Sequence, residues 1–208
     1  MIRLNEKGQS EEEFLKRYNK DAYPKASHTV DILIFTKKED KLSILLIKRK
    51  NHPCIGMWAL PGGFVNMDES LLDAAKRELL EETNVSNAPL SQLITLGDLG
   101  RDPRDRNIST GYISLIEECP IVFGDDAADA RWFDISIKEE ENFGDNKLYS
   151  LLLINEEEIN VKIRVYFNEN LLTKYRVKII ENEDIAFDHT KYLGYGLLRL
   201  MDKKIINF

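Results

Sequence analysis

The sequence is poor in cysteine and histidine, the side chains most often used in zinc sites and redox centres. Its 208 residues include two cysteines, Cys54 and Cys119, and three histidines. The cysteines have no metal-type spacing and no accompanying histidine pattern, which excludes a zinc-binding module from the expected functions. We predict that both are small buried thiols in a reducing compartment.

Long apolar segments are also missing. Residues 1–14 lack the apolar core of a signal peptide. The longest apolar run, LYSLLLI at 148–154, is too short to span a bilayer. We therefore expect a cytoplasmic protein without a membrane partner.

Positive charge is scarcer than negative charge. Lysine and arginine number 29 against 36 aspartates and glutamates, so the formal net charge is -7. An acidic surface repels phosphate backbones, and we expect no nucleic-acid partner in the absence of a local basic patch. A small anionic substrate remains compatible with this charge, because divalent metal ions bridge carboxylates to phosphates.

The length suits one domain with an added segment, and the 43% hydrophobic and 31% charged residues are ordinary for a globular protein. We predict an N-terminal helical extension over residues 1–24, with a short capped helix at 10–18. The main domain is predicted to span residues 25–208, with no internal repeats and no low-complexity tracts.

Apolar and β-branched runs predict a central mixed β-sheet with helices on both sides. The first two strands are expected to pair as a hairpin. A small β-meander, read as an insertion, is expected at about 147–180, and a C-terminal helix at about 184–203. The other predicted strands are 28–36, 43–49, a short broken strand near 57–65, 92–98, 108–117 and 130–135.

The most informative stretch is GGFVNMDESLLDAAKRELLEETNV, residues 62–85, which predicts a glycine turn followed by a helix at about 69–83. Glu78 and Glu82 lie one turn apart on a helix, and Glu81 lies one step around. They flank an apolar arc, so their carboxylates are held near the protein body, where dehydration is costly without a cation. The arc is made of Leu71, Leu72, Ala75 and Leu79. The alternative is a solvated amphipathic surface helix.

Two further features favour a metal site. Gly62 and Gly63 allow backbone carbonyls to approach a ligand closely. Arg77 can tie two carboxylates but cannot neutralise three glutamates. A carbonyl with several carboxylate oxygens suits Mg²⁺, with Mn²⁺ as a possible substitute, and such a site can activate water and hold a phosphate.

This stretch resembles the signature of the Nudix hydrolases: Gly, five residues, Glu, seven residues, then Arg-Glu-aliphatic-any-Glu-Glu-any-Gly-aliphatic. The matching residues are Gly63, Glu69, Arg77, Glu78, Leu79, Glu81, Glu82 and Val85. Asn84 stands where the family has glycine. Asparagine tolerates the left-handed conformation that ends such a helix.

The resemblance implies the Nudix α/β/α sandwich over about 31–135 and the C-terminal helix, and hydrolysis of a nucleoside diphosphate derivative by water attack on phosphorus. By position it assigns Arg77 to orienting the glutamates and Glu69 to bracing the start of the helix. The implied metal ligands are the Gly62 carbonyl, Glu78, Glu82 and, assisting, Glu81. The general base stays open among Glu117, Glu118, Asp125 and Asp126.

Three more segments resemble the ADP-ribose pyrophosphatase-like branch of the family: IKRK…GMWALPGGFV, GDLGRDPRDR and IAFDH. The resemblance implies ADP-ribose as substrate, with AMP and ribose 5-phosphate as products, and a homodimer. Leu99 and Asp105 depart from the branch pattern of the second segment.

The second segment also supports an anion site on physical grounds, because arginine forks match phosphate oxygens in pairs. Candidate substrate-binding residues are Arg49, Phe64, Arg101, Asp102, Arg104, Arg106 and His189. Asp102 is a candidate for ribose hydroxyls and Phe64 for the adenine ring. The alternatives are local Arg–Asp pairs in a surface loop, a structural His189, a solvated strand end for Arg49 and core packing for Trp58.

Two rival functions remain. The first is a non-catalytic sensor, since some members of the branch bind ADP-ribose in a Nudix-like domain and bind DNA through a winged helix. Intact glutamates, and a chain that ends soon after His189, speak against it. The second is a Nudix hydrolase for NADH, an NDP-sugar, a dinucleoside polyphosphate or a damaged nucleotide.

Overall fold

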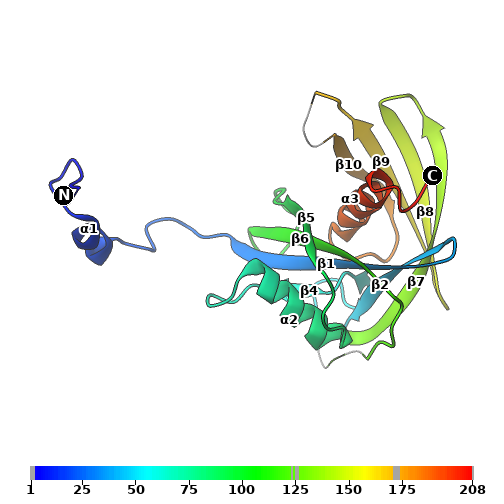
Figure 1. Cartoon of the computed structure of the whole chain (residues 1–208), viewed down its shortest axis with the longest axis horizontal. Helices are drawn as coiled ribbons and strands as arrows, with labels where there is room; N and C mark the ends of the chain where they lie inside the picture. The colour runs from blue at the N-terminus through cyan, green and yellow to red at the C-terminus, as the bar shows by residue number, and fades with distance from the viewer. Residues whose placement is uncertain (1–2, 123, 125–126, 171–173, 208) are drawn as a thin grey trace.

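The computed structural model describes residues 3–122, 124, 127–170 and 174–207. Figure 1 shows a curled sheet that carries a helix on each side, and an N-terminal arm that lies apart from it. The elements are α1 (Glu11–Arg17), β1 (Ser27–Lys38), β2 (Lys41–Arg49), β3 (Trp58–Ala59), β4 (Gly62–Phe64), α2 (Leu71–Thr83), β5 (Ser91–Leu96), β6 (Asn107–Ile116), β7 (Ala127–Asn142), β8 (Asn146–Ile154), β9 (Glu158–Phe167), β10 (Tyr175–Asn182) and α3 (His189–Asp202).

The sheet runs in the order β10-β9-β8-β7-β2-β1-β6-β5, with β3 paired to β2 and β4 paired to β1. Strands β1 and β6 are parallel, whereas β1 and β2 form an antiparallel hairpin. The predicted mixed sheet and the predicted first hairpin are therefore confirmed.

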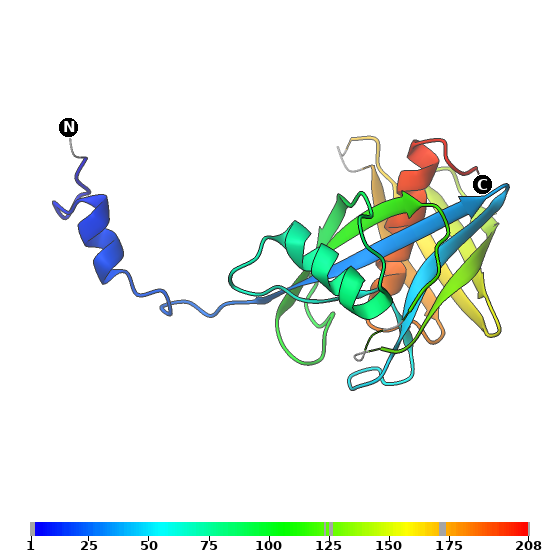
Figure 2. The same ribbon diagram turned by 60° about the horizontal axis from the view of Figure 1, so that its bottom comes forward.

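Strand β1 separates two hydrophobic cores, because its side chains alternate between the faces of the sheet. Val30, Ile32 and Ile34 pack with α2 in one core. Leu33 and Phe35 pack with α3 in the other. The predicted α/β/α sandwich is confirmed, and in Figure 2 the sheet curves around α3.

The predicted meander exists as β8, β9 and β10; its reading as an insertion stays a prediction. It continues the central sheet, because β7 extends to Asn142 instead of ending near Ile135. The first half of β7 pairs with β2 and the second half with β8. The acidic run at 139–141 concealed this extension, although Ile135 and Ile137 pack against the core.

Local signals placed the ends of α2 correctly but not the start of α3. Ser70 caps α2 by accepting from the Asp73 amide, and Asn84 ends it at φ 57 in the predicted left-handed conformation. Leu72 of the predicted apolar arc is 37% exposed, whereas Ala74 is fully buried. Helix α3 begins at His189 and not near residue 184, because Ile185 first bridges to Trp58.

The N-terminal arm contains α1, whose Ser10 and Glu13 form the predicted capping box. No residue of α1 is buried, and the arm lies away from the sheet in both views. The division into segments 1–24 and 25–208 stays a prediction. Cys54 and Cys119 are both partly exposed, so the prediction of buried thiols is wrong. Within the described residues, no helix combines the length and apolar character needed to cross a membrane.

Candidate active site

A cavity of about 110 Å³ opens where β1, the β3–β4 turn, the loop at 101–104 and the start of α3 meet. The signature glycines form one wall, and the loop arginines form another. Its lining residues are Thr29, Asp31, Arg49, Leu60, Gly62, Gly63, Phe64, Arg101, Asp102, Arg104, Phe187 and His189. The structure therefore brings the signature, the arginine loop and the IAFDH segment to one place.

Arg77 organises the acidic side of the site. Its guanidinium donates to both carboxylate oxygens of Glu69, at 3.0 and 2.7 Å. It also donates to Glu78 Oε1 at 2.7 Å and to Glu81 Oε2 at 3.0 Å. The bond from Arg77 lowers the pKa of Glu69 to about 2. Burial raises the pKa of Glu78 and outweighs the opposing bond from Arg77.

Glycine is required at positions 62 and 63 because neighbouring atoms lie too close for a Cβ. A Cβ on Gly63 would lie 2.5 Å from Glu78 Oε1, and one on Gly62 would lie 2.1 Å from the Val30 carbonyl oxygen. The Gly62 amide donates to Glu82 Oε2 at 2.8 Å. The carboxylates of α2 therefore lie directly against the glycine turn, as the signature predicted.

The donor atoms beside the glycine turn suit a divalent metal ion by their chemical type, not by their arrangement in this structure. Within the described part of the chain, no group of three or more His, Cys, Asp or Glu side chains is arranged to hold a metal ion. Arg77 contacts Glu78 and Glu81, and Glu82 accepts from Gly62. Each of these glutamates therefore has a hydrogen-bond donor, although the single positive charge of Arg77 does not neutralise the three carboxylates that it contacts. Their oxygens beside the Gly62 backbone are still the hard donors that a divalent ion takes.

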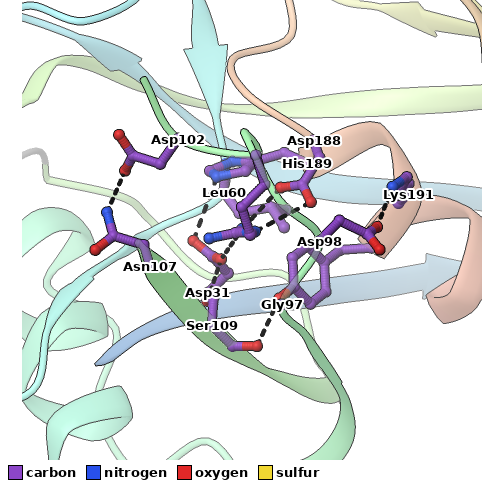
Figure 3. Close-up of polar contacts among 12 residues, drawn as sticks. Asp31, Leu60, Gly97, Asp98, Asp102, Asn107, Ser109, Asp188, His189 and Lys191 are labelled. Atoms are coloured by element: carbon purple, nitrogen blue, oxygen red, sulfur yellow. Dashed lines mark hydrogen bonds and ion pairs between the residues drawn. The ribbon is translucent and has the colours of Figure 1, made fainter. Parts of the chain in front are cut away.

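Arg101 lines the cavity and is held there by two carboxylates. Its guanidinium donates to both oxygens of Asp188, at 3.1 and 2.7 Å, and lies 3.6 Å from Asp31. Its side chain is only 5% exposed. Asp31 also accepts from Ser109 Oγ at 2.5 Å. Figure 3 shows Asp31 and Asp188 gathered in this cluster, which joins the loop to β1, β6 and α3.

His189 belongs to the same cluster. Its Nδ1 accepts from the Leu60 amide at 2.9 Å, so the ring proton lies on Nε2. That nitrogen faces Asp31 Oδ1 at 3.3 Å. Burial lowers the pKa of His189, which keeps the ring neutral. His189 therefore fixes the backbone next to the glycine turn.

Of the remaining loop arginines, Arg104 forms a local Arg–Asp pair, as the alternative interpretation predicted, whereas Arg106 bonds to a backbone carbonyl. Arg104 donates to both oxygens of Asp102, at 3.0 and 2.7 Å. Burial opposes the charge of Asp102, but bonds from Arg104 and Asn107 bring its pKa to about 2. Arg106 donates to the Gly97 carbonyl at 2.7 Å and is not among the lining residues.

Arg49 is the cavity arginine with its charge least compensated. Its Nε donates to the Pro53 carbonyl at 2.8 Å, and it forms no ion pair within the described ranges. Burial lowers the pKa of Arg49, and the nearby charge of Arg104 acts in the same direction. A bound anion, such as a phosphate, would relieve the repulsion between Arg49 and Arg104.

Sequence reasoning missed Asp31, Leu60 and Phe187. Asp31 was signalled by a charge inside the apolar run TVDILIF, whereas Leu60 contributes through its amide, which no side-chain pattern reports. Phe187 lies within the quoted IAFDH segment, next to His189. Core packing is confirmed for Trp58, which is 1% exposed and donates to Glu157 at 2.9 Å.

The general base remains open. Glu117 and Glu118 line a different, wider cavity beside the β1–β2 hairpin and β7. Asp125 and Asp126 lie outside the described residues. Gly124 donates to the Glu82 carbonyl, so the chain at 124 passes the end of α2.

Comparisons with known proteins agree with this geometry. The NUDIX domain family model matches residues 26–152. The chain is 43% identical over 109 residues to the ADPR responsive transcriptional repressor NtrR of Acinetobacter baylyi, covering 51% of this chain and 44% of that protein. It is 40% identical over 122 residues to an ADP-ribose pyrophosphatase of Methanocaldococcus jannaschii, covering 59% and 69%.

Solved structures show the same likeness. A MutT/nudix family protein from Enterococcus faecalis aligns with a TM-score of 0.72 and 32% identity, over 93% of this chain and 70% of that one. The NUDIX domain of Shewanella oneidensis NrtR, complexed with ADP ribose, aligns with a TM-score of 0.56 and 35% identity, over 60% and 82%. The chain spans less than half the length of the repressor that it matches.

Proposed function

Because this chain belongs to the NUDIX domain family, we propose that it is a Nudix pyrophosphohydrolase that cleaves ADP-ribose to AMP and ribose 5-phosphate. The observation that carries the proposal is one cavity in which the glycine turn, backed by the carboxylates of α2, faces Arg49 and two aromatic side chains. Relatives named for ADP-ribose, one a pyrophosphatase and one a repressor, support the same ligand.

In this proposal the residues divide into two groups. Arg49, which forms no ion pair within the described residues, binds a phosphate of the diphosphate. Arg77 orients Glu78 and Glu81, and the Gly62 amide orients Glu82. Nudix hydrolases generally use divalent metal ions. We propose Mg²⁺, replaceable by Mn²⁺, held by Glu78, Glu82, Glu81 and the Gly62 carbonyl, where it would polarise the phosphate and lower the pKa of a water.

The test is the Glu82→Gln variant. The amide oxygen of glutamine can still accept from Gly62, so the turn is preserved while the charge is lost. We expect ADP-ribose turnover to fall by at least about 10- to 100-fold, the effect typical of perturbing a metal site. Glu140→Gln, on the outer surface of β7, is the matched control. Turnover within about threefold of wild type for Glu82→Gln contradicts the assignment.

The second candidate function is a non-catalytic ADP-ribose sensor. It is favoured by the 43% identity to a repressor and by a structural neighbour complexed with ADP ribose. The two functions share the ligand, but only the hydrolase converts it to products. Release of AMP from ADP-ribose in the presence of Mg²⁺ identifies the hydrolase, whereas stoichiometric binding without AMP identifies the sensor.

Several finer expectations stay predictions. Absence of a nucleic-acid partner is one, because a repressor is among the relatives. The homodimer and the cytoplasmic location are two more. A turnover panel of ADP-ribose, NADH, NDP-sugars, dinucleoside polyphosphates and oxidised nucleotides, with and without Mg²⁺, would identify the substrate.

A further inference from the structure

Phe187 combines an unusual backbone with a position in the cavity. Its φ is 52, in the left-handed region that bulky side chains rarely adopt. The residue is partly exposed and lines the cavity beside His189. Strained backbone of this kind tends to occur at ligand sites, and Phe187 is therefore a candidate ligand contact.

The ring of Phe187 is surrounded by cationic and aromatic groups. The Arg49 guanidinium lies over it, with Cζ 4.9 Å from the ring centroid. The ring of His189 lies 5.5 Å away, tilted by 36°. Arg49 is held by the Pro53 carbonyl, and His189 is held by the Leu60 amide. The Phe187 ring therefore packs against two side chains whose positions are fixed by hydrogen bonds.

Arg104 contacts two aromatic rings at once. Its Cζ lies 5.7 Å from the Phe187 centroid and 5.0 Å from the Phe64 centroid. We call the space between these two rings the aromatic slot. Stacked aromatic rings have centroids about 4.5–7 Å apart, so the guanidinium lies where a planar heteroaromatic ring would be in contact with both.

The size of the cavity indicates that Arg104 is a replaceable occupant. Ligand pockets typically enclose about 300–1,000 Å³, well above the 110 Å³ found here. The Arg104 side chain is 41% exposed, whereas its partner Asp102 is 5% exposed. Arg104 can therefore turn toward solvent more easily than Asp102, and its withdrawal would enlarge the cavity.

We propose that Phe187 and Phe64 form the stacking site for the planar base of the nucleotide, and that the Arg104 guanidinium occupies this aromatic slot until the base displaces it. The inference rests on the proposed function and specifies which part of the substrate each side of the cavity binds. The base lies in the aromatic slot, and the diphosphate extends toward Arg49 and the glycine turn. The base thereby selects nucleotides over sugar phosphates.

The test compares two ligands and two variants by isothermal titration calorimetry without added metal. AMP carries the base, whereas ribose 5-phosphate lacks it. Phe187→Leu removes the ring, and Phe187→Tyr keeps it; both are bulky residues with the same backbone cost. We expect Phe187→Leu to weaken AMP binding about tenfold or more, as for loss of base–aromatic stacking. Ribose 5-phosphate binding should be unchanged, and Phe187→Tyr should bind AMP within about twofold of wild type.

Three outcomes overturn the proposal: unchanged AMP affinity in Phe187→Leu, equal losses for AMP and ribose 5-phosphate, or no measurable AMP binding by wild type. Thermal unfolding of both variants verifies that they fold alike. The proposed function is tested separately, by AMP release from ADP-ribose by the wild type with Mg²⁺. Wild-type turnover with an unaltered KM in Phe187→Leu would reject the aromatic slot and keep the hydrolase.

Discussion

At the scale of single residues, the cavity side chains divide into those that hold the site together and those with capacity for a ligand. Arg101 and His189 have their hydrogen bonds committed to Asp188, Asp31 and the Leu60 amide. Arg49 forms no ion pair within the described residues and donates to the Pro53 carbonyl. This division was not visible in the sequence, where all three side chains were candidates for binding the substrate.

The role of His189 can be separated into its two bonds. In His189→Asn the amide oxygen can replace Nδ1 as acceptor for Leu60, whereas in His189→Gln the amide nitrogen can replace Nε2 as donor to Asp31. We predict that His189→Gln destabilises the protein by about 1–3 kcal/mol, the cost of an unpaired buried amide, and that His189→Asn destabilises it less. Urea denaturation measures both, and a smaller loss for His189→Gln than for His189→Asn would refute the assignment.

The same residue predicts a pH dependence. Burial holds the pKa of His189 below its ordinary 6.5 in the folded protein, so the unfolded chain binds one more proton as the pH falls through 6.5. Unfolding is therefore favoured at acid pH. We predict that the stability advantage of wild type over His189→Asn is largest above pH 7 and shrinks toward pH 5.5. His28 is present in both proteins and cancels, so a constant difference would show that His189 is not buried in the neutral form.

At the scale of elements, local patterns predicted α2 well. The Ser70 cap, the spaced glutamates and Asn84 are all contiguous signals, and each was found where expected. The start of α3 and the length of β7 depended on partners distant in sequence. Ile185 bridges to Trp58, and the charged end of β7 is a strand because β8 pairs with it.

The end of α2 gives a prediction for one substitution. Asn84 has φ 57 and ψ 16, a conformation in which asparagine and glycine are tolerated and other residues pay about 1–2 kcal/mol. We predict that Asn84→Gly leaves stability within about 0.5 kcal/mol of wild type, whereas Asn84→Ala loses about 1 kcal/mol. Thermal unfolding midpoints of the pair decide this; equal losses in both variants would mean that the side chain, not the backbone conformation, is what matters.

At the scale of the whole molecule, the candidate site is assembled from segments between Thr29 and His189 by the fold itself. The parallel pairing of β1 with β6 brings Asp31 beside Ser109, and the curled sheet brings the start of α3 against the β3–β4 turn. The contiguous signature was therefore predictable from sequence. The cluster around Asp31 and the aromatic slot were not, because each joins distant parts of the chain: His189 lies against Asp31, and Arg104 lies against both Phe64 and Phe187.

The relatives include a repressor and a pyrophosphatase that are both named for ADP-ribose. Binding of ADP-ribose alone therefore does not distinguish the two functions, and the central claim is that this protein hydrolyses it. The most direct measurement is product formation by the wild-type protein with ADP-ribose, followed by ³¹P NMR with Mg²⁺ and again with excess EDTA. The account predicts AMP and ribose 5-phosphate in equal amounts with Mg²⁺ and neither with EDTA. Intact ADP-ribose that binds the protein but yields no AMP with Mg²⁺ or Mn²⁺ would contradict it.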